Sequence, residues 1–539
     1  MGVGNVVRRA CTVTILAGFT MLACTPRAAL ASHAQLAMFE DDATLQAHPQ
    51  AALQTFKQLG AGIVRVYVKW SAIAPDPTST TPDSTFDAAD PAAYPAQNWT
   101  TYDTIVRDAK ALGLQLDFTV SGGAPLWAQS TGIPDGFGTP VFAWKPSAAA
   151  YGQFVQALGT RYSGSYVPPG QSAPLPRVSF WALWNEPNVG KDLGPQATNG
   201  SSLLTAPAMY RGLLDAGWSA LQATRHGLDT ILIGSLAARG QAAPVGPGRP
   251  DGLPGNYGMT KPLAFLRSLY CLDSRYQPLT GAAASASGCP ASPASFRAAH
   301  PGLFAASGFA DHPYPVNLPP TRATANDRDF TEFSQLPNLE KVLDRVQRTY
   351  SSTKRFPIYI TEYGYVTNPP NNSQPFVSPA TAAVYLNWAE YLSWRDPRIA
   401  TTMQYLLRDP NPRVGVPEFG GFATGLRFFG GTPKPTLAAY RMPLFLPSTS
   451  ATARQRTLEV WGCVRPAHYA ALATHRAQTA LIQFRRGSRG GFATIKRVPI
   501  TDPRGYFDVR VAFPASGAVR IAWSDRGINT SRVVPVVVR

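Results

Sequence analysis

The chain has 539 residues, of which 45% are hydrophobic and 11% aromatic, and it carries a formal net charge of +17. A chain of this length is too long to fold around one ordinary hydrophobic core. It predicts roughly two to four domains, unless one domain is a large barrel. The composition excludes a disordered chain, because apolar runs recur between the loops that 50 Pro and 46 Gly indicate.

The N-terminus has the features of a secretory signal. A basic pair at residues 8–9 precedes a mostly apolar segment at 11–24, and the small residues at 29–31 offer a cleavage site. The apolar segment is too short to span a bilayer comfortably. We therefore expect residues 1–31 to be a signal peptide and the protein to be secreted or held at the cell surface. Residues 21–24 loosely resemble a lipoprotein box, and residues 8–9 loosely resemble a twin-arginine signal. A lipoprotein anchored at Cys24 and export by the twin-arginine route therefore stay open as variants of this signal.

Eight strand-helix units follow in about 410 residues, more than the roughly 250 of a minimal barrel but normal for one with long loops. The expected strands are residues 35–40, 62–70, 114–120, 180–184, 230–234, 306–311, 357–362 and 402–407, and a loop-rich excursion precedes the sixth. This alternation predicts an α/β fold, a (β/α)8 barrel over residues 32–444. Loops after the carboxyl ends of barrel strands build active sites, so polar residues at those ends are the candidates for function.

The pattern changes at residue 445. Short apolar runs at 457–461, 480–484, 507–511 and 519–523 are separated by turn residues, which predicts an all-β sandwich as an accessory domain over 445–539. This segment holds 15 Arg or Lys against 4 Asp or Glu, a net charge of +11. Such a patch could attract acidic glycans or an anionic envelope, and arginines on the exposed strands of an ordinary domain are the alternative.

Five cysteines are compatible with export. Cys11 and Cys24 lie in the expected signal peptide, whereas Cys271 and Cys289 flank a segment rich in Ala, Ser and Gly that a disulfide would restrict. Cys463 is then expected to be a buried thiol. No Cys or His cluster has metal-ligand spacing, so we expect neither a metal nor another cofactor.

The stretch FWALWNEPN at residues 180–188 changes abruptly from apolar to polar at Asn185 and Glu186. Desolvation by the tryptophans would favour a protonated Glu186, the form that donates a proton in glycosidic bond cleavage. A Glu that caps the next loop or pairs with an Arg is the alternative. Glu362 ends the seventh strand at the same face of the barrel, and two facing carboxylates are the minimum that glycoside hydrolysis needs.

Three further polar residues belong to these strands: Arg65 lies within the second strand, and His312 and Tyr314 follow the sixth. An Arg and a Tyr hydroxyl near a carboxylate would favour its ionised form. In such a pair, the neutral carboxyl group acts as the acid, and the charged carboxylate acts as the nucleophile or stabilises positive charge.

These motifs resemble those of the clan A glycoside hydrolases, the superfamily that holds the cellulase-type family 5 and the xylosidase-type family 39. LWNEPN at 183–188 looks like their acid/base strand and ITEYG at 360–364 like their nucleophile strand. His312 and Tyr314 match their sixth-strand pair, and Arg65 matches their second-strand arginine. The likeness covers roughly residues 35–444. The chain departs from the clan pattern at 120–123, which lacks a His, and at 404–409, which lacks a Trp.

The resemblance implies a retaining mechanism. Glu186 would protonate the leaving oxygen and later activate water, while Glu362 would attack the anomeric carbon. Asn185 would bind the sugar 2-hydroxyl, and Tyr314 would orient Glu362. Aromatic side chains that could stack on sugar rings or could instead pack in the core are Trp70, Trp127, Trp184 and Tyr365.

We therefore expect a secreted, monomeric retaining glycoside hydrolase that acts on a β-linked or equivalent oligosaccharide, polysaccharide or glycoside. Its partner is the carbohydrate substrate, without nucleic acid and without a membrane span after signal removal. One alternative is a catalytically silent glycan-binding or envelope protein, against which the presence of both glutamates, Asn185 and Tyr314 argues. Another is a transglycosylase of envelope glycan, which would share every residue named here. The sequence contains neither a serine hydrolase motif nor a phosphate-binding loop in the strand and helix context that such a motif requires.

Overall fold

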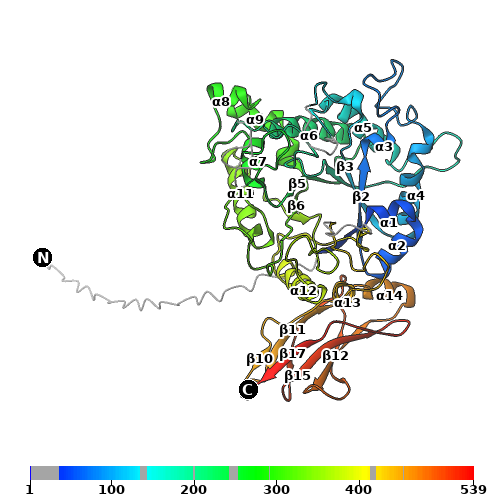
Figure 1. Cartoon of the computed structure of the whole chain (residues 1–539), viewed down its shortest axis with the longest axis vertical. Coiled ribbons are helices and arrows are strands. Elements are labelled where there is room, and N and C mark those ends of the chain that lie inside the picture. The colour runs from blue at the N-terminus through cyan, green and yellow to red at the C-terminus, as the bar shows by residue number, and fades with distance from the viewer. Residues whose placement is uncertain are drawn as a thin grey trace.

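The computed structural model describes Met1 and residues 35–133, 143–197, 201–241, 253–290, 292–412, 421–452 and 454–539 (Figure 1). The expected signal peptide and the lipoprotein variant at Cys24 lie outside these residues, apart from Met1, and stay predictions. No helix in the described part of the chain combines the length and the hydrophobicity that a membrane span requires.

Eight parallel strands form the predicted barrel, which is confirmed. They are β1 (Leu36–Glu40), β2 (Ile63–Lys69), β3 (Gln115–Ser121), β4 (Phe180–Leu183), β5 (Thr230–Ala237), β6 (Gly308–His312), β7 (Ile358–Ile360) and β8 (Thr401–Tyr405). Neighbours pair in the order β7-β6-β5-β4-β3-β2-β1-β8. The ring closes between β7 and β8, where the Ile358 amide donates to the Arg398 carbonyl at 2.7 Å and the Ala400 amide to the Ile358 carbonyl at 2.8 Å.

Helices surround the barrel on its outer side (Figure 1). They are α1 (Asp42–Ala47), α2 (Pro49–Gln58), α3 (Trp70–Ile73), α4 (Ala96–Leu112), α5 (Ala148–Arg161), α6 (Ala206–Ala223), α11 (Leu336–Thr349), α12 (Pro379–Arg395) and α13 (Pro435–Arg441). Local sequence explains several boundaries. Ser147 and Ser378 accept amide hydrogen bonds as N-caps of α5 and α12, and Gly113 adopts a φ of 70° as it ends α4.

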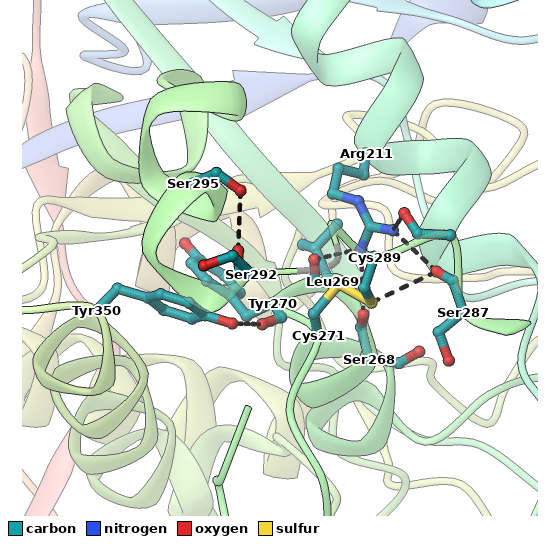
Figure 2. The surroundings of a disulfide bond; sticks show 11 residues. Arg211, Ser268, Leu269, Tyr270, Cys271, Ser287, Cys289, Ser292, Ser295 and Tyr350 are labelled. Atoms are coloured by element: carbon teal, nitrogen blue, oxygen red, sulfur yellow. Dashed lines mark hydrogen bonds between the residues drawn. A yellow bond between two sulfur atoms is a disulfide. The ribbon is translucent and has the colours of Figure 1, made fainter. Parts of the chain in front are cut away.

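The excursion between β5 and β6 is more helical than the sequence suggested. It contains α7 (Pro262–Leu269), α8 (Gly281–Ala286), α9 (Pro293–Ala299) and α10 (Gly302–Ala305). The predicted disulfide between Cys271 and Cys289 is confirmed. Figure 2 shows Arg211 of α6 beside it, where the guanidinium donates to the carbonyls of Leu269 and Ser287, each at 2.9 Å. The bridge and Arg211 thus attach this insertion to the barrel.

The predicted β-sandwich is also confirmed. Its strands are β9 (Leu444–Phe445), β10 (Ser450–Ala451), β11 (Thr457–Cys463), β12 (Thr479–Arg486), β13 (Ala493–Pro499), β14 (Tyr506–Ala512), β15 (Gly517–Ser524), β16 (Ile528–Thr530) and β17 (Val534–Val538). One sheet holds β10, β17, β15, β12 and β13 with β16 beside β15, and the other holds β14, β11 and β9. The sequence did not predict the helix α14 (Ala467–Thr474).

The sandwich packs against the amino-terminal ends of the barrel strands. The Tyr469 hydroxyl donates to the Ala61 carbonyl just before β2, and Arg465 forms a buried ion pair with Glu390 of α12. Cys463 is a buried free thiol at this interface, as predicted. The carboxyl ends of the strands, and with them the candidate site, therefore face away from the sandwich (Figure 1).

Candidate active site

The end of β4 turns sharply around Glu186. The Trp184 amide still donates to the Val120 carbonyl of β3. Trp184 and Glu186 then have φ values of 72° and 42°. Backbone in this left-handed region is unfavourable for residues other than glycine and occurs often at functional sites.

Hydrogen bonds to the end of β5 hold this turn in place. The Glu186 amide donates to the Ser235 carbonyl at 2.9 Å, next to an irregularity in the pairing of β5 with β6. The buried Asn188 side chain donates to the Ala237 carbonyl at 3.0 Å and accepts from the Ala237 amide at 2.9 Å. Glu186 is therefore fixed from both sides of the turn.

Glu362 follows β7 and is held in its ionised form. Arg65 donates to its Oε1 at 2.6 Å, and the Tyr314 hydroxyl donates to its Oε2 at 3.2 Å. Burial would raise the pKa of Glu362, but the charges of His312 and Arg65 and the two hydrogen bonds together lower it. A carboxylate with a lowered pKa and a partly accessible side chain is suited to act as a nucleophile.

The fully buried Arg65 connects several strand ends. Besides Glu362, it donates to Glu40 Oε2 at 2.5 Å, to Asn185 Oδ1 at 2.7 Å and to Thr119 Oγ1 at 2.9 Å. Burial and the nearby negative charge of Glu362 raise the pKa of Glu40 well above its usual range, although Arg65 opposes this. Sequence reasoning missed Glu40, yet its position as the last residue of the first predicted strand was a usable signal.

The two glutamates and His312 meet at the mouth of the barrel. His312 Nδ1 lies 3.0 Å from Glu186 Oε1 and 3.6 Å from Glu362 Oε1. One carboxylate oxygen of each glutamate lies within 4.8 Å of the other. The side chains of Glu186 and Glu362 are 20% and 12% exposed, so a substrate can reach both.

The same three side chains form the one His and carboxylate cluster in the described part of the chain that is tight enough to hold a metal ion. The guanidinium of Arg65 already contacts Glu362 Oε1, and its positive charge would repel a cation bound at that oxygen. The arrangement fits acid/base and nucleophilic chemistry better than metal binding.

Three of the four aromatic candidates lie in the core. Trp70 and Trp184 are fully buried and contact Tyr151 edge-on, with ring centroids 5.8 and 5.3 Å away. Tyr365 is 1% exposed, and its hydroxyl donates to the Leu318 carbonyl. No ring face of these three is open to a sugar, so packing, the alternative weighed from the sequence, describes them.

Trp127 lies in the loop after β3 and is partly exposed. Its Nε1 donates to the Pro75 carbonyl at 3.1 Å, and its ring meets Trp70 and Phe86 edge-on. Trp127 thus belongs to the rim of the barrel, where the structure gives it no contact with either glutamate.

An aromatic group that the sequence did not suggest lies beside Glu362. Phe422, from the loop after β8, is 44% exposed and meets Tyr314 and Tyr405 edge-on at centroid distances of 4.9 and 5.7 Å. Tyr405 is the last residue of β8 and lies within the stretch 404–409, which lacks a Trp. Phe422 had no sequence signal, because its place depends on the path of a long loop.

No protein-family model matches this sequence, and a search of curated proteins finds no match. Solved structures of glycosidases align with the chain at low identity. A family 39 glycoside hydrolase from Bacteroides cellulosilyticus is 14% identical over 94% of this chain and 80% of its own, with a TM-score of 0.45. An endo-β-1,4-mannanase from Thermotoga petrophila is 11% identical over 94% and 98%, with a TM-score of 0.40. A family 1 β-glucosidase from Thermotoga maritima is 14% identical over 74% and 85%, with a TM-score of 0.42.

Proposed function

We propose that this protein is a secreted retaining glycoside hydrolase that cleaves β-linked or equivalent glycosides by double displacement. The observation that carries the proposal is the pair Glu186 and Glu362, whose nearest carboxylate oxygens lie within 4.8 Å at the mouth of the barrel. Retaining glycosidases place their carboxyl groups about 5 to 5.5 Å apart, whereas inverting enzymes need about 6.5 to 9.5 Å to admit a water molecule.

In the first step, the ionised Glu362 attacks the anomeric carbon and forms a covalent glycosyl-enzyme, while Glu186 gives its proton to the departing oxygen. In the second step, Glu186 accepts a proton from water, and that water displaces Glu362 from the sugar. Arg65 and Tyr314 favour the charged form of Glu362 before attack. His312 Nδ1 can donate to Glu186 when Glu186 is ionised, which supports its role as base in the second step.

Asn185 is suited to bind the sugar next to the cleaved bond. Its Oδ1 accepts from Arg65, which fixes the orientation of the amide and leaves the amide nitrogen as a donor for a sugar hydroxyl. Phe422 and Tyr405 supply aromatic surface around Tyr314, whose hydroxyl donates to Glu362. A sugar ring at this position would contact both kinds of surface.

The first prediction tests the two glutamates on an aryl glycoside with a good leaving group. We expect Glu362→Gln to lower kcat by at least about 10³-fold, because no carboxylate remains to attack. Glu186→Ala should retain the first step on such a substrate, and added azide should restore turnover and give a β-glycosyl azide.

A product of inverted configuration, or full activity of either variant, would contradict the proposal. Wild-type protein that binds oligosaccharides but turns over none of a broad aryl-glycoside panel would point to the silent scaffold. Release of longer oligosaccharides in place of free sugar would point to the transglycosylase.

A further inference from the structure

The outer face of the six-stranded sheet carries a row of arginines. Ala480, Ile482 and Phe484 of β12 point into the core of the sandwich, so the alternate residues of that strand point outward. The pairing of β12 with its neighbours then brings outward-facing arginines together from three strands: Arg485 on β12, Arg497 on β13 and Arg520 on β15.

Two of these arginines are held in fixed positions. Arg520 Nε donates to Gln483 Oε1 at 2.9 Å. The guanidinium groups of Arg520 and Arg485 lie 4.2 and 5.0 Å from the centroid of the Phe492 ring. Such contacts restrict the side chains and lower the entropy that binding a partner would cost.

A groove continues this face at one end of the sheet. It measures about 660 Å³, and Arg476, Arg497 and Arg526 line it together with Gln478 and Asp525. All three arginines are exposed, and Asp525 is the one acidic residue among the described residues that line the groove. We call Arg476, Arg485, Arg497, Arg520 and Arg526 the arginine face.

The arginine face has one neighbouring carboxylate, that of Asp525, and no ion pair among the described residues. Within the described chain, none of its five guanidinium groups forms an ion pair, whereas Arg65, Arg161, Arg267 and Arg465 of the same protein all do. Five like charges beside the single carboxylate of Asp525 repel one another, and a bound polyanion would relieve that repulsion.

The position of the face separates it from the catalytic mouth. The three-stranded sheet of the sandwich carries Trp461 and Tyr506, which pack with Tyr391 and Trp394 of α12. The six-stranded sheet is therefore the layer farther from the barrel, and both sheets lie at the end of the barrel opposite to the carboxyl ends of its strands (Figure 1). A polymer on the arginine face would leave the active site open.

We propose that the arginine face binds an anionic polysaccharide that carries carboxylate groups, and so holds the enzyme on its substrate matrix. The planar guanidinium matches a carboxylate with two parallel hydrogen bonds. Single exposed ion pairs contribute little, so the ligand must be a polymer that engages several arginines at once. The choice of a polysaccharide rests on the proposed function. Single-stranded nucleic acid is less favoured, because such sites stack bases on aromatic rings, and the ring of Phe492 beside this face already contacts two guanidinium groups.

The test measures retention of the full-length protein on immobilised polygalacturonate at low and moderate salt. A triple variant Arg485→Gln, Arg497→Gln and Arg520→Gln should bind at least about tenfold more weakly, and wild-type binding should weaken as salt shortens the Debye length from about 30 Å at 0.01 M to about 10 Å at 0.1 M. The matched control is Arg454→Gln, Arg510→Gln and Arg539→Gln, which removes the same charge from the same domain outside the arginine face. Both triples should keep the wild-type melting temperature.

Equal weakening by the two triple variants would overturn the proposal, because net charge alone would then explain binding. Tighter retention on anionic phospholipid vesicles or on duplex DNA than on polygalacturonate would also overturn it. Hydrolysis of a small aryl glycoside by both triples should match wild type. Retention without any glycosidase activity in the wild type would contradict the proposed function and leave the arginine face supported.

Discussion

At the scale of single residues, Arg65 determines how charge is arranged at the barrel mouth. One buried guanidinium contacts carboxylates at the end of β1 and after β7, and side-chain oxygens on β3 and after β4. The pKa of Glu40 is raised and that of Glu362 is lowered. Arg65 therefore favours the charged form of Glu362, the proposed nucleophile, whereas burial disfavours the charged form of Glu40.

Tyr314→Phe should move the acidic limb of the pH profile of kcat/KM to higher pH. The variant loses the hydrogen bond that helps lower the pKa of Glu362, and activity disappears as pH falls through that pKa. We expect kcat/KM to fall by about 10-fold to 100-fold, in line with about 1.5 to 3 kcal/mol for a hydrogen bond to a charged group.

Tyr365→Phe is the control for this change. It removes a hydroxyl that bonds the Leu318 carbonyl and touches neither glutamate. An acidic limb that stays in place for Tyr314→Phe, or moves equally in both variants, would show that Tyr314 does not act on Glu362.

Asp117→Asn should flatten the dependence of stability on pH. Burial raises the pKa of Asp117 to about 7, against which the charges of Arg65 and His312 work, and neither carboxylate oxygen has a hydrogen-bond partner among the described residues. Between the ordinary pKa near 3.8 and about 7, the folded state binds more protons than the unfolded state, so stability falls as pH rises.

The free energy of unfolding, measured with urea at pH 4.5 and 7.5, checks this prediction. The drop between the two values should be smaller in Asp117→Asn than in wild type by up to about 3 kcal/mol. Asp108→Asn, on the partly exposed side of α4, should follow the wild-type slope. If the free energy of unfolding changes equally with pH in wild type, Asp117→Asn and Asp108→Asn, the raised pKa of Asp117 is refuted.

At the scale of elements, glycines allow the helices behind β4 to approach closely. A Cβ at Gly159 of α5 would lie 2.2 Å from Thr224 Oγ1 and 2.9 Å from Thr224 Cβ, just after α6. We expect Gly159→Ala to destabilise the protein by about 1 to 3 kcal/mol, because a well-packed contact would be overfilled.

Gly212→Ala in α6 is the matched control. Its Cβ would meet only Ala148 Cβ, at an ordinary 3.5 Å, and Ala is a better helix former than Gly by about 1 kcal/mol. Thermal unfolding should therefore show opposite shifts in melting temperature. Equal shifts in melting temperature would show that the close contact between Gly159 and Thr224 does not determine the effect of adding a methyl group.

The regular elements of the barrel were predictable from the sequence. The runs at 180–184 and 357–362 correspond to β4 and β7, because alternating or continuous apolar residues bounded by Gly and Pro indicate buried strands. The insertion before β6 was not predictable in this way. Its helices, such as α8 and α10, are four to six residues long. Helices of that length depend on tertiary contacts rather than on an internal period.

At the scale of the whole molecule, one buried ion pair links the barrel to the sandwich. Arg465 donates to both carboxylate oxygens of Glu390, and the Tyr506 hydroxyl adds a hydrogen bond at 2.9 Å. Arg465→Met should cost about 3 to 5 kcal/mol, because the carboxylate of Glu390 stays buried without its cation.

The double variant Arg465→Met and Glu390→Met tests the reason for that loss. Replacing a buried ion pair by apolar side chains of similar volume is often neutral, so most of the stability should return. The free energy of unfolding measures both effects. A double variant as unstable as the single one would show that packing, rather than an unpaired charge, causes the loss.

The sequence by itself determined the barrel, the sandwich and the polar residues at strand ends, because strand period and strand-end position are local properties of the chain. It identified Glu186, Glu362 and Tyr314 by their place after strands and Arg65 within the second strand, and the structure brings all four together. Only the tertiary structure decided which aromatic rings are accessible, burying Trp184 and exposing Phe422. Solvent exposure depends on how distant segments cover one another, and no local pattern of residues records that.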